Sequence, residues 1–511
     1  MPRPSAPRAW ATALTSGVLL ALAFPPIDLA PLAWIGLVPA GLWLASEEHG
    51  RRRSPREAWG LGYALGLVFF GIGLHWIAFL SKVAVTVSWI MYPAWFAAAA
   101  YLALYPALAA ALAALARRRL GLPIAIGWPL FWLASEWLRA QGELGFPWLH
   151  LGYSQWNVLA VLQLATLSGV SGVSLFVAAL NGLVLGALTL GGRARMACAA
   201  AALALVALPF AWYGPRIPPA HPAGPALGLI QGNVPGSVKW SGKHEDDVLA
   251  KFMVLSRQAI ADGARFVIWP ETSTGSYLRQ NLDQRMRLQD FVDSTEVAIL
   301  TGYPDYRFTG PKTALSWNAA GVFWPHTGLG PQYAKMHLVP FGEKMPFEWL
   351  IPAIGRLDLG QAEWTPGADP SPLPTPFGPA GVLVCFESIF SDPARAEVLR
   401  GATWLVVLTN DEWFGKSGAL AQHAEMSVFR AVEHRVPLAR CANTGLTFLV
   451  DPWGRKTAAP PIFEDAVVVL PLPAPAHQRT PFTRLGDLAG PLLAGIAGLV
   501  FALSLGRRRA P

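Results

Sequence analysis

Long apolar segments recur along this chain, and they constrain its fold more than any other feature of the sequence. A helix needs about 20 consecutive apolar residues to cross the hydrocarbon core of a bilayer. Windows that approach this length cover residues 9–24, 29–46, 58–80, 94–116, 122–140, 166–190, 195–213 and 487–505. A disordered polymer, a collagen, a coiled coil and a single soluble globule carry no such windows, so these classes are excluded. The sequence therefore predicts an integral membrane protein with about eight transmembrane helices.

The amino-acid composition supports the same class. Hydrophobic residues make up 53% of the 511 residues and charged residues only 14%, against about 25% charged residues in a typical soluble domain. The net charge of +8 does not indicate a nucleic-acid partner, because the arginines lie at the ends of apolar windows and form no basic face among aromatic residues. We therefore expect this chain to meet membrane lipid and no nucleic acid.

The arginines also predict the orientation of the windows, because cytoplasmic loops of membrane proteins carry an excess of Lys and Arg. With one helix in the apolar run 84–116, every basic cluster falls on the same side of the membrane, whereas two helices there would break this pattern. The clusters are Arg3 with Arg8, Arg51 to Arg53 with Arg56, Arg117 to Arg119, Arg193 with Arg195, and Arg507 to Arg509. We expect eight helices with both termini in the cytoplasm.

The first window also resembles a secretory signal peptide, since basic residues and an apolar stretch precede Ala21-Leu22-Ala23. We expect an uncleaved anchor, because Phe24-Pro25-Pro26 leads within a few residues into the next window. Cleavage would not change the side on which any later segment lies.

Residues of about 214–486 read as a soluble α/β domain between the seventh and eighth windows. Short β-rich runs alternate there with helix-compatible stretches such as 244–263 and 419–435. The runs are 226–230, 266–269, 297–300, 381–384, 404–408, 448–450 and 466–470. The chain thus divides into a transmembrane part, 1–213, an extracytoplasmic domain, 214–486, with its core at about 226–470, and a last helix with a basic tail, 487–511.

Reactive side chains follow two of the apolar strands of this domain. Glu271 follows the run 266–270, and Cys385 follows the run 381–384. Lys335 and Glu343 lie between them in a loop. Taken singly, each has an ordinary structural explanation: a carboxylate that caps a turn, a buried core cysteine, or a solvated lysine. Strand ends are also where the sites of α/β folds assemble, so the sequence alone leaves both explanations open.

Taken together, these residues resemble the Glu–Lys–Cys triad of the nitrilase, or carbon–nitrogen hydrolase, superfamily. Further short motifs agree with the resemblance, in the domain Gln231-Gly232-Asn233, Thr409-Asn410-Asp411, Trp413-Phe414-Gly415, Arg430-Ala431 and Asn443-Thr444-Gly445, and in the membrane part Phe146-Pro147-Trp148-Leu149 and Leu151-Gly152-Tyr153-Ser154-Gln155-Trp156. One branch of the superfamily places this domain between seven N-terminal helices and one C-terminal helix. Over nearly its whole length, the chain resembles that branch, the apolipoprotein N-acyltransferase family.

The resemblance implies an αββα sandwich and a division of roles. Cys385 would be the nucleophile and Glu271 the general base that takes the thiol proton. Lys335 would stabilise the oxyanion, with Glu343 and Glu387 as supporting residues. Trp240 would contact substrate, or else be an interfacial anchor. The chain departs from the expected pattern at Phe386, where the family pattern leads us to expect Tyr.

The resemblance further implies N-acylation of a diacylglyceryl-cysteine at an apolipoprotein N-terminus. The acyl chain would come from a phospholipid, typically phosphatidylethanolamine, by a ping-pong mechanism through a Cys385 thioester. The location would be the cell inner membrane with the domain in the periplasm. We expect no cofactor and no metal, because His337 and His423 lack metal-ligand spacing. The alternatives are a membrane-tethered amidase that uses water as acceptor, and a transporter, whose usual repeated halves are not evident in this sequence.

Overall fold

The computed structural model describes residues 6–48, 50–80, 88–220, 224–311, 313–351, 363–476 and 478–506. It contains two compact units. Unit 1 comprises Met1–Phe79, Trp89–Pro218 and Leu485–Pro511, and unit 2 comprises Leu80–Ser88 and Pro219–Arg484. Arg3 and Arg507 to Arg509, which entered the orientation argument, lie outside the described residues.

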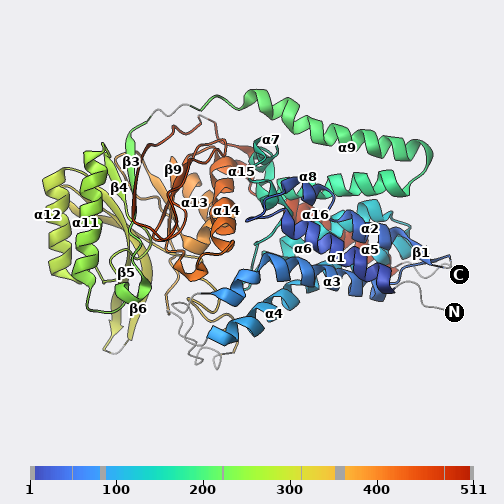
Figure 1. Cartoon of the computed structure of the whole chain (residues 1–511), viewed down its shortest axis with the longest axis horizontal. Coiled ribbons are helices and arrows are strands. Elements are labelled where there is room, and N and C mark those ends of the chain that lie inside the picture. The colour runs from blue at the N-terminus through green and yellow to red at the C-terminus, as the bar shows by residue number, and fades with distance from the viewer. Residues whose placement is uncertain are drawn as a thin grey trace. The chain divides into compact units, whose positions relative to one another are not determined.

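Unit 1 is helical (Figure 1), and each predicted window contains a helix. Its main helices are α1 (Ala6–Leu22), α2 (Val38–Ala45), α3 (Pro55–Gly73), α4 (Met91–Leu102), α5 (Leu104–Leu120), α6 (Ile124–Arg139), α8 (Ala165–Thr189), α9 (Gly192–Tyr213) and α16 (Ala489–Gly506). Among the described residues, four segments are long and apolar enough to cross a membrane: Met91–Leu120, Ala165–Thr189, Gly192–Arg216 and Ala489–Gly506. The apolar run that could have held two helices is thus one candidate span, formed by α4 and α5 together.

Local sequence sets the ends of these helices. At the start of α3, the Ser54 hydroxyl accepts a hydrogen bond from the Glu57 backbone N–H and the Glu57 carboxylate accepts one from the Ser54 N–H, which is a capping box, and Pro55 occupies the first turn. The helix α5 ends at Leu120, and the capping residue Gly121 that follows has a φ of +72°, in the left-handed region that glycine tolerates best.

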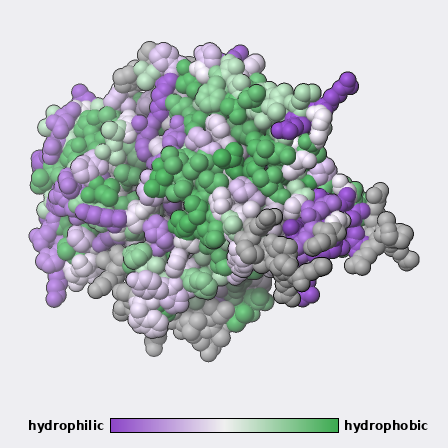
Figure 2. Space-filling model, turned by 45° about the vertical axis from the view of Figure 1, so that its right-hand side comes forward, coloured by the Kyte–Doolittle hydropathy of each residue, from purple (hydrophilic) through white to green (hydrophobic). Residues whose placement is uncertain are grey.

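Unit 1 also presents large apolar side chains on its surface. On α9 and α16, Leu203, Leu208, Leu492 and Leu499 are each more than half exposed. Hydrophobic residues form broad patches in the space-filling view (Figure 2). Apolar surface of this extent is unfavourable in water but matches the hydrocarbon of a bilayer. The exposed helix faces therefore support a membrane protein.

Unit 2 is an αββα sandwich, which confirms the predicted nitrilase-like domain. A six-stranded sheet has the order β12-β3-β4-β5-β6-β7 and a four-stranded sheet the order β11-β10-β9-β8. The strands are β3 (Ala226–Gln231), β4 (Phe266–Ile268), β5 (Ile299–Gly310), β6 (Thr313–Trp324), β7 (Gly328–Ala334), β8 (Ala380–Val384), β9 (Trp404–Thr409), β10 (Leu438–Ala442), β11 (Phe448–Val450) and β12 (Ala466–Pro471). Helices α11 (Glu245–Ala261) and α12 (Leu282–Thr295) contact the larger sheet, while α13 (Ser391–Leu399) and α14 (Ala419–His434) contact the smaller one (Figure 1).

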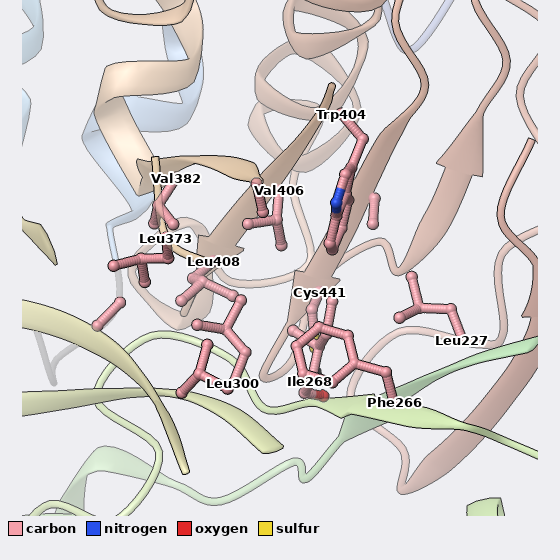
Figure 3. Packing of buried hydrophobic residues seen from close by; sticks show 14 of the residues in the cluster. Leu227, Phe266, Ile268, Leu300, Leu373, Val382, Trp404, Val406, Leu408 and Cys441 are labelled. Carbon is pink, nitrogen blue, oxygen red and sulfur yellow. Dashed lines mark hydrogen bonds between the residues drawn. The ribbon is translucent and has the colours of Figure 1, made fainter. Parts of the chain in front are cut away.

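The core of unit 2 lies between the two sheets. Leu227, Phe266 and Ile268 of the larger sheet belong to the same buried cluster as Trp404 and Val406 of the smaller sheet (Figure 3). Every side chain of β9 is buried, which fits a central parallel strand that is covered on both faces. This packing holds the ends of β4, β7 and β8 in fixed positions, and the candidate site lies at those ends.

Candidate active site

Glu271 lies just beyond β4, and each oxygen of its buried carboxylate accepts a hydrogen bond. One oxygen, Oε1, accepts a hydrogen bond from the Asn318 side-chain amide at 2.8 Å. The other, Oε2, accepts one from the Asn410 backbone N–H at 2.9 Å. The Glu271 side chain is 8% exposed. Its orientation is therefore fixed by β6 and by the end of β9, rather than by a turn that it caps.

Lys335 follows β7, and its ammonium is paired inside the same site. Its Nζ lies 2.8 Å from Glu343 Oε1 and 3.7 Å from Glu271 Oε1, with 1% of the side chain exposed. Burial opposes the positive charge, but Glu343 and Glu271 outweigh it and raise the pKa of Lys335 above its ordinary value. Glu343 is itself held by the Val339 N–H, which donates to its Oε2 at 2.9 Å. Lys335 thus carries a fixed positive charge and is not a solvated surface lysine.

Cys385 follows β8 at a sharp turn, with a φ of +53° that a non-glycine residue rarely adopts. Its backbone carbonyl accepts hydrogen bonds from the Ser388 hydroxyl at 2.8 Å and from His423 Nε2 at 3.1 Å. Desolvation and the nearby Glu271 carboxylate raise the pKa of the Cys385 thiol well above its ordinary value, although Lys335 opposes this. Burial and Glu271 therefore favour the neutral thiol over the thiolate, so that forming a thiolate here would require a base.

Glu387, two residues beyond Cys385, is completely buried and binds the backbone of β8 and of the loop that follows β7. Its carboxylate accepts hydrogen bonds from the Val384 N–H at 2.7 Å, from the Met336 N–H at 2.6 Å and from the Tyr333 hydroxyl at 2.9 Å. Burial raises its pKa despite these donors. Glu387 therefore ties the end of β8 to the loop that carries Lys335.

A second polar network lies beneath Cys385, and the sequence reading did not find it. Asp411 Oδ2 accepts a hydrogen bond from Arg440 Nη2 at 2.8 Å, and Asp411 Oδ1 lies 3.0 Å from His423 Nδ1. The Arg440 guanidinium overcomes the effect of burial and keeps the pKa of Asp411 below its ordinary value. Because His423 also contacts the Cys385 carbonyl, this network helps to fix the backbone of Cys385. Its only sequence signal was the Thr409-Asn410-Asp411 motif, which indicated the family but no role.

Among the residues that the structure describes, one group of possible metal ligands is found, and it belongs to this network. Cys385, Asp411 and His423 each present a ligand atom, and these atoms lie within 4.8 Å of one another. The Arg440 guanidinium lies 2.8 Å from Asp411 and 3.0 Å from His423 Nδ1. A cation placed there would be repelled by this buried positive charge. The residues present therefore do not fit a metal site.

The structure also places Trp240 and Phe386, which the sequence analysis singled out, and the second cysteine of unit 2, Cys441. Trp240 follows the short helix α10 (Gly236–Lys239), and its side chain is 49% exposed. Phe386 is buried and packs edge-on against Phe390. The Cys441 thiol points at the carbonyl oxygens of Ile230 and Ile268 in the core between the sheets, and it forms no disulfide.

Comparison with known proteins gives the family. The family model described as the apolipoprotein N-acyltransferase N-terminal domain matches residues 16–183, and the carbon-nitrogen hydrolase model matches residues 227–481. The apolipoprotein N-acyltransferase of Geobacter metallireducens is 35% identical over 512 residues, covering 98% of this chain and 96% of that protein. The enzyme of the same name from Methylococcus capsulatus is 34% identical, with 97% and 96% covered.

Among solved structures, the carbon-nitrogen hydrolase from Helicobacter pylori G27 is similar at a TM-score of 0.38 and 18% sequence identity, and it covers 48% of this chain and 89% of that one. The two relatives, by contrast, are similar along nearly the whole chain and extend over both regions that the family models match. With this similarity and the site geometry together, the chain belongs to the apolipoprotein N-acyltransferase family.

Proposed function

We propose that this protein is an acyltransferase that N-acylates the N-terminal diacylglyceryl-cysteine of apolipoproteins, with a phospholipid as acyl donor and Cys385 as nucleophile. The observation that carries the proposal is the buried Glu271–Lys335–Glu343 cluster, in which the Glu271 charge raises and the Lys335 charge lowers the pKa of the Cys385 thiol. Membership of the apolipoprotein N-acyltransferase family supports the choice of donor and acceptor.

In the first half-reaction, Glu271 takes the thiol proton while Cys385 Sγ attacks the ester carbonyl of the phospholipid. Negative charge develops on the carbonyl oxygen, and the Lys335 ammonium stabilises it in a site that excludes bulk water. The carbon–oxygen bond to glycerol then breaks, and Glu271 returns its proton to the departing oxygen. The products are a lysophospholipid and a thioester on Cys385.

In the second half-reaction, the α-amine of the diacylglyceryl-cysteine attacks the thioester carbonyl. Glu271 accepts a proton from the amine, Lys335 again stabilises the oxyanion, and the carbon–sulfur bond breaks. Cys385 recovers its proton, and the acceptor carries a new amide. Glu343 and Glu387 position Lys335 and its loop, and Trp240, which is half exposed, is the residue that we assign to contact with a lipid substrate.

The acyl-enzyme provides the first test. Purified full-length protein incubated with phosphatidylethanolamine alone is expected to accumulate an acyl adduct on Cys385, measured by mass spectrometry of the intact protein and its peptides. Neutral hydroxylamine should remove the adduct, because thioesters are cleaved and amides are not. A diacylated lipopeptide with a free N-terminal amine should discharge it, and the N-acetylated lipopeptide should not. Release of free fatty acid as fast as phospholipid is consumed, without an amine, would favour the amidase alternative.

Phosphatidylethanolamine is our proposal for the donor, and the inner membrane is our proposal for the location. We also propose eight transmembrane helices, with residues 214–486 on the periplasmic side and both termini in the cytoplasm. The support is the positive-inside pattern, together with the helix found in each apolar window.

Topology can be tested separately from chemistry. An alkaline phosphatase fusion at Gly310 is expected to be active, since this enzyme folds correctly only outside the cytoplasm, where its disulfides can form. A fusion after Arg509 is expected to be inactive, because that residue lies in the basic tail. An inactive Gly310 fusion that is expressed at the level of the control would contradict the eight-helix topology.

A further inference from the structure

We infer that Arg440 fixes the tautomer of His423, and that His423 thereby positions Cys385 for acylation through a hydrogen bond to its backbone carbonyl. Both are positioning residues, because they act through the backbone of Cys385 and not on the reacting atoms. The inference rests on the proposed function, since it takes Cys385 as the nucleophile. The sequence reading gave Arg440 no role and considered His423 only as a metal ligand.

Three elements of the smaller sheet and its helix layer bring these side chains together. Arg440 lies on β10, and its neighbours Ala439 and Cys441 belong to the core between the two sheets. Because successive side chains of a strand point to opposite faces, Arg440 points to the other face of the sheet, which α14 contacts. His423 lies in the second turn of α14, and Asp411 follows β9. Arg440, His423 and Asp411 are each at most 1% exposed.

The two ring nitrogens of His423 face partners of opposite kinds. Nδ1 lies 3.0 Å from Arg440 Nη2, and a guanidinium can only donate hydrogen bonds. Nε2 lies 3.1 Å from the Cys385 carbonyl oxygen, which can only accept them. The nearby Ser388 hydroxyl gives its own proton to the same carbonyl, at 2.8 Å. A neutral ring with its proton on Nε2 therefore satisfies both sides, since it accepts from Arg440 and donates to Cys385.

The other protonation states leave these contacts mismatched. With the proton on Nδ1 alone, that N–H would face the guanidinium, and the bare Nε2 would face the carbonyl oxygen. An imidazolium would place a second positive charge beside Arg440 Nη2. Asp411 Oδ1 lies 3.0 Å from Nδ1, but it already accepts a hydrogen bond from the Thr409 hydroxyl at 2.7 Å. Burial and Arg440 lower the pKa of His423 below its ordinary value, which agrees with a neutral ring.

The guanidinium of Arg440 occupies this position at a cost to stability. It is completely buried, and its Nε and Nη1 make no hydrogen bond with any residue that the structure describes. Burying the donors of a charged group without partners is unfavourable, and an apolar side chain on this face of β10 would avoid the penalty. Nη2 is the nitrogen that binds Asp411 and His423. We therefore assign the Arg440 charge to these two contacts.

The hydrogen bond from His423 acts on a backbone conformation that needs support. Cys385 has a φ of +53°, which a non-glycine residue holds only where its surroundings enforce it. The Nε2–H of His423 ties the peptide after Cys385 to α14, and the orientation of this peptide helps to determine where Sγ lies. Losing the contact should move the sulfur relative to Glu271 and Lys335. A displacement of about 1 Å can cost about 10²-fold in rate.

The first test is acylation of the full-length protein by phosphatidylethanolamine, with the maximal rate and the half-saturating lipid concentration measured separately. His423→Phe keeps a ring but has no donor, and it is expected to lower the maximal rate by about 10²-fold without changing the half-saturating concentration. His423→Gln supplies an amide N–H in place of Nε2–H and should stay within a few-fold of wild type. The matched control is His326→Phe, at an exposed histidine in the turn between β6 and β7, and it should change nothing.

The second test reads the tautomer directly, by nitrogen NMR of the full-length protein labelled with ¹⁵N-histidine. The His423 signals are those that disappear in His423→Gln. In the wild type, Nδ1 should be bare and Nε2 should carry the proton. In Arg440→Met, the donor that faces Nδ1 is gone and Asp411 remains, so Nδ1 should gain a proton. The wild-type spectrum tests the tautomer even where Arg440→Met does not fold, because it needs no change at Arg440.

The outcomes separate the inference from the proposed function. A wild-type protein that forms no thioester would overturn the proposed function. If the wild type is acylated, three results would overturn the inference alone: a fully active His423→Phe, an equal loss in His423→Phe and His423→Gln, or a wild-type ring with its proton on Nδ1. An equal loss in the two variants would show that His423 only packs. A bare Nδ1 in folded Arg440→Met would overturn the role assigned to Arg440.

Discussion

Replacing Cys385 by Ala is expected to reduce acyl transfer by about 10⁴-fold or more, the scale seen when the nucleophile of a catalytic unit is removed. In the proposed mechanism, the sulfur is the atom that carries the acyl chain between the two half-reactions, and alanine offers no group that could take its place. Thermal unfolding should change little, because Cys385 is only partly buried and its side chain is small. The measurement is the yield of N-acylated lipopeptide per enzyme, with the unfolding temperature as a check on the fold.

Cys441→Ala is the matched control for this variant. Cys441 is completely buried in the core between the sheets, away from any base, so its replacement should cost about 1 kcal/mol of stability and leave the acyl transfer rate within a few-fold of wild type. Cys198, in α9 of unit 1, should likewise be dispensable. Retained activity in Cys385→Ala would disprove the thioester mechanism as a whole.

Lys335→Met is expected to lower the rate of thioester formation by about 10²- to 10³-fold, which is the usual cost of removing one oxyanion donor. The loss has two sources that must be separated. One is the missing charge at the transition state, and the other is Glu343, which would be left buried and unpaired.

The double variant Lys335→Met with Glu343→Gln separates these two sources. It removes both charges, so its stability should recover most of what the single variant loses. Its acylation rate should stay low if Lys335 acts on the transition state. Recovery of both stability and rate in the double variant would show that Lys335 serves only to neutralise Glu343.

The sequence predicted the outline of unit 2 better than its detail. All seven β-rich runs are strands in the structure, and the stretches at 244–263 and 419–435 are the helices α11 and α14. These elements have short apolar runs or a clear helical period, so their own residues identify them. The sequence reading did not find β6, β7 and β10, nor the helices α12 and α13. Strand β6 begins with exposed residues, Thr313, Ala314 and Leu315, that show no alternation of polar and apolar positions, and its pairing with β5 depends on a partner that a local pattern does not contain.

The sequence predicted which residue types form the site, but it did not predict the contacts between them. Glu271, Lys335 and Cys385 could be predicted because each is reactive and because the set resembles a known triad. The burial of Lys335, the left-handed backbone of Cys385 and the network of Asp411, His423 and Arg440 are consequences of tertiary packing. Residues separated by dozens of positions meet there only once the two sheets have packed.

Glu387 links the end of β8 to the loop after β7, and this link between the two halves of the sandwich has a consequence for the folding chain. Glu271 and Lys335 follow strands of the larger sheet, whereas Cys385 follows a strand of the smaller one. In the proposed mechanism, a chain whose two sheets have not yet packed would therefore hold Cys385 without its base. Such a chain would not form a thioester with the surrounding phospholipid. Acyl transfer would then require the packed sandwich, so activity would report that the domain has folded.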